Sequence, residues 1–217
     1  EYTILVCLGI SVPTVLRVVG AEIDLRMKQV YPADQSFEVD YSGNTEDSWL
    51  GVYVSGETSE EPIQRIEIPA SETDSGIAEV KGLPAGKYQL AFYRYSSNPV
   101  LIRDFIVTDN NLYMDRVCYE QGSQGILTIE RAPSSDSAWI GVYPKDVVPG
   151  EDNCLFWEYV NAFEDSTCID LNQLQTKGAF SKLPIGEYVL YLFGDASYTV
   201  EEEFAFSVIS SSCTRAL

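Results

Sequence analysis

The chain has 217 residues, of which 45% are hydrophobic and 12% aromatic, so one or two domains with packed cores are expected and intrinsic disorder is not. It has 14 Lys and Arg residues against 33 Asp and Glu residues, a formal net charge of −19, which excludes nucleic acid and anionic membrane surfaces as partners. The absence of histidine excludes Ser-His and Cys-His nucleophile pairs and removes the commonest zinc ligand.

The N-terminal segment, residues 1–21, is typical of a secretory signal peptide. Its apolar portion is short, is interrupted by Pro13 and Arg17, and ends in the small residues Gly20 and Ala21. We expect cleavage near Ala21, a secreted or cell-surface protein, and no membrane insertion once the signal is removed. The alternatives are an additional N-terminal strand or a membrane anchor weakened by Arg17.

Two stretches of the chain return in the same order. Asp47-Ser-Trp-Leu-Gly-Val-Tyr53 is repeated as Asp136-Ser-Ala-Trp-Ile-Gly-Val-Tyr143, and Leu83-Pro-Ala-Gly-Lys-Tyr88 as Leu183-Pro-Ile-Gly-Glu-Tyr188. Two shared blocks in one order indicate a structural unit used twice. We predict a first repeat over residues 22–108, a short linker at 109–111, a second repeat over 112–209 and a polar tail at 210–217.

Short segments of alternating polar and apolar residues, separated by Gly- and Pro-containing turns, predict seven strands in each repeat. In the first repeat these are 23–27, 36–41, 49–53, 63–68, 77–80, 88–93 and 100–107, with a turn at 31–34. In the second they are 113–118, 125–130, 138–143, 155–160, 178–181, 187–193 and 198–208. This pattern predicts an all-β fold of two tandem antiparallel Ig-like β-sandwiches.

The Leu-Pro-x-Gly-x-Tyr block resembles the tyrosine corner of fibronectin type III domains, in which the tyrosine hydroxyl bonds backbone upstream. The Trp-[Leu/Ile]-Gly-Val-Tyr block resembles a motif of SKICH-like domains and is similar to the N-terminal Ig-like domain of purple acid phosphatases. The resemblance implies a sandwich that binds or targets and does not catalyse. We interpret Trp49, Tyr88, Trp139 and Tyr188 as structural core residues.

Five cysteines are present, and Cys7 falls within the expected signal peptide. The other four permit three pairings, and an even number suits an oxidising compartment. We favour Cys154–Cys168, because both flank a connection that is longer in the second repeat, and Cys118–Cys213, because the first and last strands of an Ig sandwich are often parallel neighbours. Free thiols in a cytosolic protein are the alternative.

Four residues of the second repeat are candidate ligand contacts. Alternation along 155–160 places Trp157 and Tyr159 on one face, either as core packing or as an exposed aromatic platform for a sugar ring or a partner protein. Asp195 and Tyr198 lie on the hairpin that recognition modules of this architecture often use. Its charges, including Glu201–Glu203, are also explained as a solvated edge. On the loop after Tyr143, Lys145, Asp146, Glu151 and Asp152 are candidates for a charged rim.

No catalytic, nucleotide-binding or calcium-loop motif is present, so we expect no enzyme, no cofactor and no metal site. The hypothesis is a non-catalytic extracellular binding, adhesion or accessory module with a protein or carbohydrate ligand. The alternatives are an accessory region of a larger secreted phosphoesterase or glycosidase, and an assembly subunit whose open sheet edges pair with neighbours.

Overall fold

The computed structural model describes residues 2–6, 14–18, 22–43, 47–56, 61–69, 74–95, 97–163, 168–172, 180–210 and 213. Near the N-terminus, β1 (Tyr2–Val6) and β2 (Thr14–Val18) pair antiparallel in a sheet of their own, with Tyr2 opposite Val18. Signal-peptide function of residues 1–21 stays a prediction.

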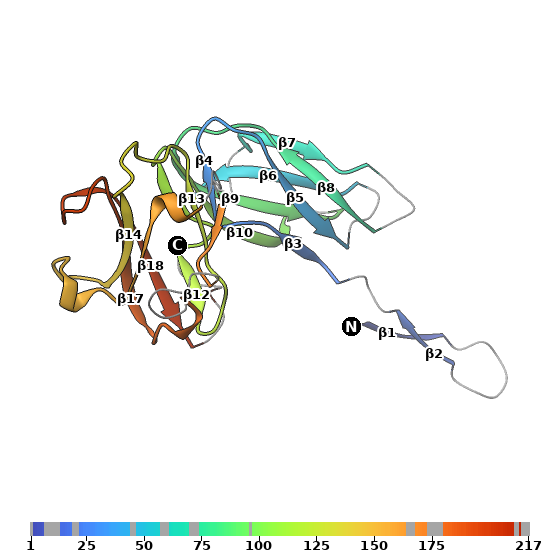
Figure 1. Cartoon of the computed structure of the whole chain (residues 1–217). Helices are drawn as coiled ribbons and strands as arrows, with labels where there is room; N and C mark the ends of the chain where they lie inside the picture. Colours follow the sequence, from blue (N-terminus) through green and yellow to red (C-terminus); the bar gives the residue numbers. More distant parts are fainter. Residues whose placement is uncertain are drawn as a thin grey trace. The chain divides into compact units, whose positions relative to one another are not determined.

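The first sandwich consists of a three-stranded sheet, in the order β3-β5-β8, and a five-stranded sheet, in the order β4-β10-β9-β6-β7 (Figure 1). Its strands are β3 (Asp24–Arg26), β4 (Val30–Pro32), β5 (Phe37–Ser42), β6 (Trp49–Val54), β7 (Gln64–Glu67), β8 (Ser75–Val80), β9 (Gly86–Tyr93) and β10 (Pro99–Thr108).

The second sandwich repeats this arrangement strand for strand, as β11-β13-β16 and β12-β18-β17-β14-β15. Its strands are β11 (Leu112–Met114), β12 (Cys118–Glu120), β13 (Ile126–Ile129), β14 (Trp139–Pro144), β15 (Phe156–Tyr159), β16 (Cys168–Asp170), β17 (Gly186–Phe193) and β18 (Val200–Ile209). In each sandwich a short early strand pairs parallel with the last one, β4 with β10 and β12 with β18. The predicted all-β fold of two tandem Ig-like sandwiches is confirmed.

Three strand predictions are corrected. Tyr31 and Pro32 were expected in a turn at 31–34 but belong to β4, and the expected strand 113–118 is two strands that belong to different sheets. The chain changes sheets at Asp115, whose carboxylate accepts hydrogen bonds from the Tyr119 hydroxyl and the Ile126 N–H. The expected strand 178–181 lies partly outside the described residues, and Phe180–Lys182 is the 3-10 turn η3. The strand that pairs with β13 is β16.

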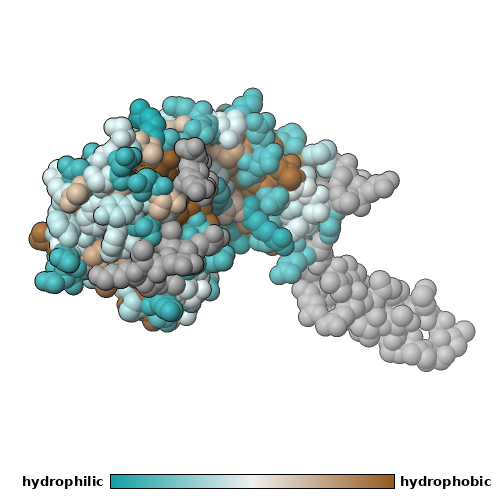
Figure 2. Space-filling model, in the orientation of Figure 1, coloured by the Kyte–Doolittle hydropathy of each residue, from teal (hydrophilic) through white to brown (hydrophobic). Residues whose placement is uncertain are grey.

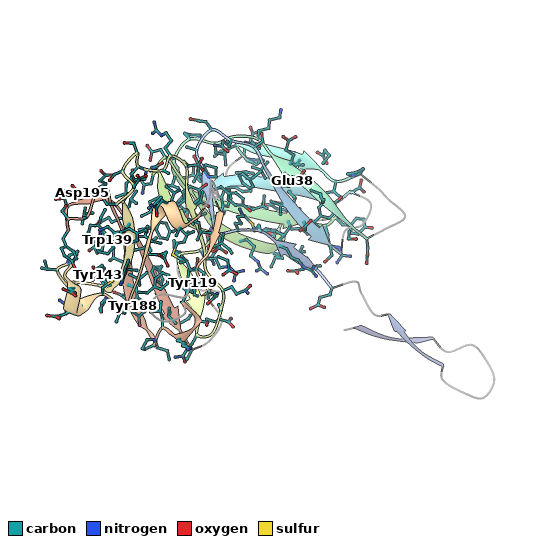
Figure 3. The ribbon with its side chains drawn as sticks, viewed as in Figure 1. Glu38, Tyr119, Trp139, Tyr143, Tyr188 and Asp195 are labelled. Atoms are coloured by element: carbon teal, nitrogen blue, oxygen red, sulfur yellow. A yellow bond between two sulfur atoms is a disulfide. The ribbon has the colours of Figure 1, made fainter. Side chains whose placement is uncertain are left out.

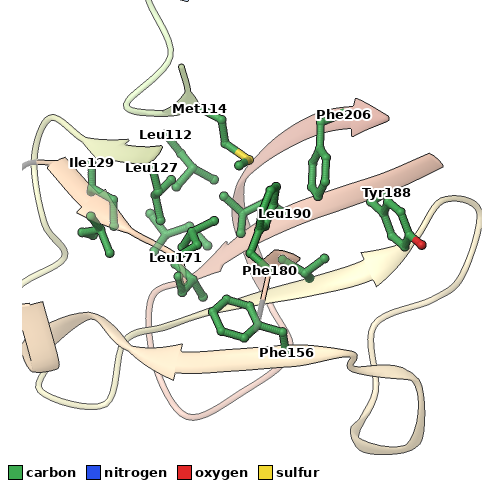
Figure 4. Packing of buried hydrophobic residues seen from close by; sticks show 14 of the residues in the cluster. Leu112, Met114, Leu127, Ile129, Phe156, Leu171, Phe180, Tyr188, Leu190 and Phe206 are labelled. Carbon is green, nitrogen blue, oxygen red and sulfur yellow. The ribbon is translucent and has the colours of Figure 1, made fainter. Parts of the chain in front are cut away.

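The core of the second sandwich lies between its two sheets (Figure 4). Tyr188, Leu190 and Leu192 of β17 point into it, as their alternation predicts. The Tyr188 hydroxyl donates a hydrogen bond to the Pro184 carbonyl at 2.7 Å, which is the expected tyrosine corner. Burial raises the pKa of Tyr188. The corresponding Tyr88 of the first sandwich is also buried.

One of the two expected disulfides is present. Cys118, on β12, is bonded to Cys213 just beyond β18, with a sequence separation of 95 and a Cα–Cα distance of 5.9 Å. The Cys154–Cys168 bridge is not formed, because Cys154 carries a free thiol. Cys154 precedes β15 of the five-stranded sheet, whereas Cys168 begins β16 of the three-stranded sheet.

The chain divides into two compact units that do not follow the repeats. One comprises Glu1–Met27, Ser36–Lys81 and Tyr88–Arg103, and the other Lys28–Gln35, Gly82–Lys87 and Asp104–Leu217. The repeat boundaries given above therefore remain predictions. The face shown in Figure 2 is mainly hydrophilic, with apolar residues in small patches, which is consistent with the acidic composition.

Candidate ligand-binding site

The central strand β14 is apolar on both faces. Ile140 and Val142 belong to the core between the sheets, whereas Trp139 and Tyr143 belong to a separate aromatic cluster on the outer face of the five-stranded sheet (Figure 3). Gly141 lies between their rings, because a Cβ atom there would come within 2.8 Å of Tyr143 Cε2 and 2.9 Å of Trp139 Cζ3. Two rings therefore fold over a position that only glycine can fill without displacing them.

Trp139 is fixed by contacts on several sides. Its ring stacks on Phe193 of β17, with the ring centroids 4.1 Å apart. Trp157 and Tyr198 approach it edge-to-face, with centroid distances of 6.4 Å and 5.4 Å. The indole N–H donates a hydrogen bond to the Ser197 carbonyl at 3.2 Å. The largest ring of the cluster is thus held in one orientation before any ligand arrives.

An open pocket of about 410 Å³ lies against this cluster. Its lining comes from β14, the 3-10 turn η1 (Glu151–Asn153), β15 and the loop between β17 and β18: Trp139, Glu151, Cys154, Trp157, Tyr159, Ala196 and Tyr198. We call it the aromatic pocket. Tyr159 and Tyr198 are 42% and 45% exposed, so a ligand has access to their rings. The volume lies within the range of small-ligand sites, roughly 300–1,000 Å³.

The rings of the aromatic pocket stand nearly perpendicular to one another. Trp157 and Tyr159 meet at an interplanar angle of 87° with centroids 5.3 Å apart. Trp139 makes angles of 87° with Trp157 and 88° with Tyr198. The rings therefore pack edge-to-face against one another and do not lie in one plane.

Two polar groups lie at the base of the pocket region. The Cys154 thiol donates a hydrogen bond to the Phe156 carbonyl, with a sulfur–oxygen distance of 3.1 Å. The Tyr143 hydroxyl is buried and has no hydrogen-bond partner among the described residues. Burial, followed by the neighbouring Cys154 thiol, raises the pKa of Tyr143, so this phenol stays protonated.

Asp195 shapes the pocket's loop but does not line it. Its carboxylate accepts a hydrogen bond from the Ser197 N–H at 2.7 Å, and hydrogen bonds from Ser197 lower the pKa of Asp195. The same residue, Ser197, supplies the carbonyl that holds Trp139. Asp195 therefore acts on the pocket indirectly, through the conformation of the loop that carries Ala196 and Tyr198.

The structure brings together three of the four predicted contact residues, Trp157, Tyr159 and Tyr198. Trp139, predicted as a core residue, is buried at 8% exposure in the outer aromatic cluster, and it also lines the pocket. Cys154 was expected in a disulfide and instead lines the same pocket as a free thiol. Alternation could have placed Trp139 and Tyr143 on one face, but it does not say which face is inward.

The first sandwich has a different arrangement at the same register. Trp49 stacks on Tyr93, with centroids 3.8 Å apart, and the Arg65 guanidinium lies 4.0 Å from the centroid of the Trp49 ring. Arg65 also forms an ion pair with Glu67, with an Nε–Oε1 distance of 2.6 Å. We call this arrangement the Trp49 cluster. Its tryptophan is covered by a side chain of the neighbouring strand.

Strand pairing gives the correspondence between the two sandwiches. Gly51 pairs with Arg65 and Trp49 with Glu67, while Gly141 pairs with Trp157 and Trp139 with Tyr159. The charged pair of the first sandwich is therefore replaced by two aromatic residues in the second.

No protein-family model and no curated protein matches the chain. Among solved structures it is similar to the human OSCAR ligand-binding domain, at 12% identity and a TM-score of 0.31 over 86% of this chain and 97% of that one. A biofilm-associated protein BSP domain has 11% identity and a TM-score of 0.35, over 87% of this chain and 30% of that one. A Salmonella alpha-2-macroglobulin has 13% identity and a TM-score of 0.33, over 88% and 15%. These likenesses identify no relative, and the fold assignment rests on the strand order.

The described residues contain neither a metal-binding cluster nor a membrane-spanning helix. Within them, no group of three or more Cys, Asp and Glu side chains is placed to hold a metal ion. In the same part of the chain, no helix combines the length and apolar character needed to cross a membrane.

Proposed function

We propose that the protein is a non-catalytic extracellular binding module and that the aromatic pocket of the second sandwich is its ligand-binding site. The observation that carries the proposal is the contrast at equivalent positions. The first sandwich places the charged Arg65 and Glu67 beside its tryptophan. The second places Trp157 and Tyr159 at the paired positions, beside an open pocket whose Tyr159 and Tyr198 rings are 42% and 45% exposed. Exposed, preorganised aromatic side chains are typical binding hot spots.

The ligand class we propose is a protein or a carbohydrate. Aromatic rings bind both, through burial of apolar area and through their π faces. The resemblance of both repeats to SKICH-like and fibronectin-like sandwiches supports a binding or accessory role. The Cys118–Cys213 disulfide supports an extracellular setting, since such bonds persist in oxidising compartments.

The test is a ligand selection with a matched variant. The wild-type chain and a Tyr159→Ala/Tyr198→Ala variant are compared on a glycan array and in a selection from a displayed peptide library. Both tyrosines are well exposed, so the fold should be retained, and thermal unfolding by circular dichroism checks this. The proposal expects ligands that bind the wild type and lose most of their affinity for the variant. Ligands that bind both proteins equally would place the binding surface elsewhere.

A further inference from the structure

The Trp49 cluster shows which chemical group fits the outer face of this sheet. The Arg65 guanidinium lies over the Trp49 ring at 4.0 Å, well within the range of cation–π contacts. Glu67 pairs with the same guanidinium, so the cation is bound by an aromatic ring and a carboxylate together. The first sandwich thus fills this position with a cation from its own chain.

The second sandwich keeps the ring and lacks the cation. Trp157 stands at the position of Arg65 and Tyr159 at the position of Glu67, as the strand pairing shows. Lys145, a cation on the same sheet, is paired with Glu187 at 2.7 Å and is not in the lining. Glu151 is the charged side chain in the lining, and it is an anion.

We infer that the aromatic pocket binds a cationic group, a guanidinium or alkylammonium, supplied by the ligand. This inference rests on the proposed binding function of the pocket and specifies its ligand chemistry. Tyr159 and Tyr198, the two well-exposed rings of the lining, are available for cation–π contacts with a compact cation. Glu151 contributes the carboxylate that Glu67 supplies in the first sandwich.

The net charge of −19 favours the same class of ligand, because an acidic surface attracts basic partners and raises their rate of encounter. The source of the cation is a basic side chain of a partner protein or a free alkylammonium compound. Both present the same chemistry to the pocket, and the experiment below separates them.

The test compares cations with neutral compounds of the same shape. Binding of N-acetyl-arginine amide, N-acetyl-lysine amide and tetramethylammonium is measured by two-dimensional NMR on the whole chain, following the indole signals of Trp139 and Trp157. N-acetyl-citrulline amide is the neutral match for arginine, and glucose is the sugar control. We expect the arginine compound to bind about 10-fold more tightly than the citrulline compound, the difference that a desolvated cation–π contact supplies.

The relative affinities identify the source of the cation. Tighter binding of the two amino-acid amides indicates a basic side chain of a partner, and tighter binding of tetramethylammonium indicates a free alkylammonium. Equal binding of the arginine and citrulline compounds, or preferential binding of glucose, would overturn the cation inference. Indole signals that respond to none of these compounds would overturn it as well.

Variants test the correspondence with Arg65 directly. Trp157→Arg/Tyr159→Glu installs the charged pair of the first sandwich beside Trp139, and we expect it to weaken cation binding at least about 10-fold by occupying the site from within. Glu151→Gln alters an exposed loop residue and should weaken binding about 3-fold without affecting the fold. Arg65→Gln in the first sandwich is the matched control and should leave binding at Trp139 unchanged. Full affinity in both pocket variants would contradict the inference.

These outcomes also separate the inference from the proposed function. A neutral ligand whose binding depends on Tyr159 and Tyr198 would support the binding function and contradict the cation inference. Ligands whose affinity is unchanged in all pocket variants would contradict both.

Discussion

The two sandwiches share their strand order and their central Trp-x-Gly-x-Tyr strand, yet their outer faces differ. In the first, a charged strand residue, Arg65, covers the tryptophan. In the second, Trp157 takes that position and an open pocket results. The duplicated motif therefore supplies an aromatic surface, and the neighbouring strand determines whether charged or aromatic side chains lie beside it. Four predictions test this difference, and they follow in order of expected effect.

The largest difference is the disulfide bond of the second sandwich. Cys118 and Cys213 have a sequence separation of 95, and no corresponding bond joins described residues of the first sandwich. Replacing both cysteines by serine should lower the free energy of unfolding of the second sandwich by about 4 kcal/mol, because the unfolded chain regains the entropy of an open loop. Hydrogen exchange measured by mass spectrometry resolves the two sandwiches. Protection should fall in β14 and β17, and an equal fall in β5 and β8 would show that the bond stabilises both.

The glycines beneath the rings should be equally sensitive in both sandwiches. Gly51→Ala and Gly141→Ala each place a Cβ atom within 2.9 Å of a tryptophan ring, and each should cost about 2 kcal/mol of unfolding free energy through overpacking. Gly150→Ala is the control, since no atom lies within 4 Å of its added Cβ. Denaturant unfolding measures the effect. If the Gly51 and Gly141 variants lost different amounts of unfolding free energy while the control lost none, the two aromatic surfaces would not be packed alike.

The tyrosine hydroxyls should respond in opposite directions. Tyr53 and Tyr93 share a buried hydrogen bond of 2.8 Å, so Tyr53→Phe should destabilise the first sandwich by about 1 kcal/mol or more. In the second sandwich Phe193 replaces Tyr93, and the Tyr143 hydroxyl lacks a partner within the described part of the chain. Tyr143→Phe should therefore be neutral or stabilising. Thermal unfolding compares the two, and a loss of stability in Tyr143→Phe would reveal an undetected partner.

The smallest expected difference between the sandwiches is in the pH dependence of their stability, and it is measurable only at alkaline pH. Burial raises the pKa of Tyr93 in the first sandwich, and of four tyrosines in the second: Tyr119, Tyr143, Tyr188 and Tyr191. Above a pH of about 10 the unfolded chain loses phenolic protons that the native state retains, so stability falls as pH rises. The second sandwich should lose more. Phenolate absorbance, recorded with hydrogen exchange, tests this, and earlier alkaline opening of the first sandwich would contradict it.

The sequence predicted the architecture because the signals were local and duplicated. Turn residues and alternation gave most strands, and the Leu-Pro-x-Gly-x-Tyr block gave the corner that Tyr188 forms. Strands of three residues, such as β4 and β16, were missed because so short a segment shows no period. The sheet change at Asp115 was missed because it depends on which distant strand each half pairs with.

The site was predicted in part for the same reason. Trp157, Tyr159 and Tyr198 were recognised as conspicuous aromatic residues, but their meeting around Trp139 depends on register between β14 and β15. Trp139 was predicted in the core because it opens a central strand of the repeated block. It is buried, but alternation alone does not say on which face of a strand that is apolar on both sides. Pairing Cys154 with Cys168 failed because nearness along the chain does not reveal that two segments belong to opposite sheets.

The Cys118–Cys213 bond also has a mechanical consequence. It joins β12 to the chain just beyond β18, and these are the first and last strands of the five-stranded sheet in chain order. A pulling force applied across the second sandwich therefore passes through a covalent bond. The enclosed segment, whose ends have a sequence separation of 95 and which would span about 320 Å when extended, cannot be stretched until that bond is reduced. Under tension the first sandwich can lengthen, while the residues that line the aromatic pocket stay within the segment closed by the disulfide.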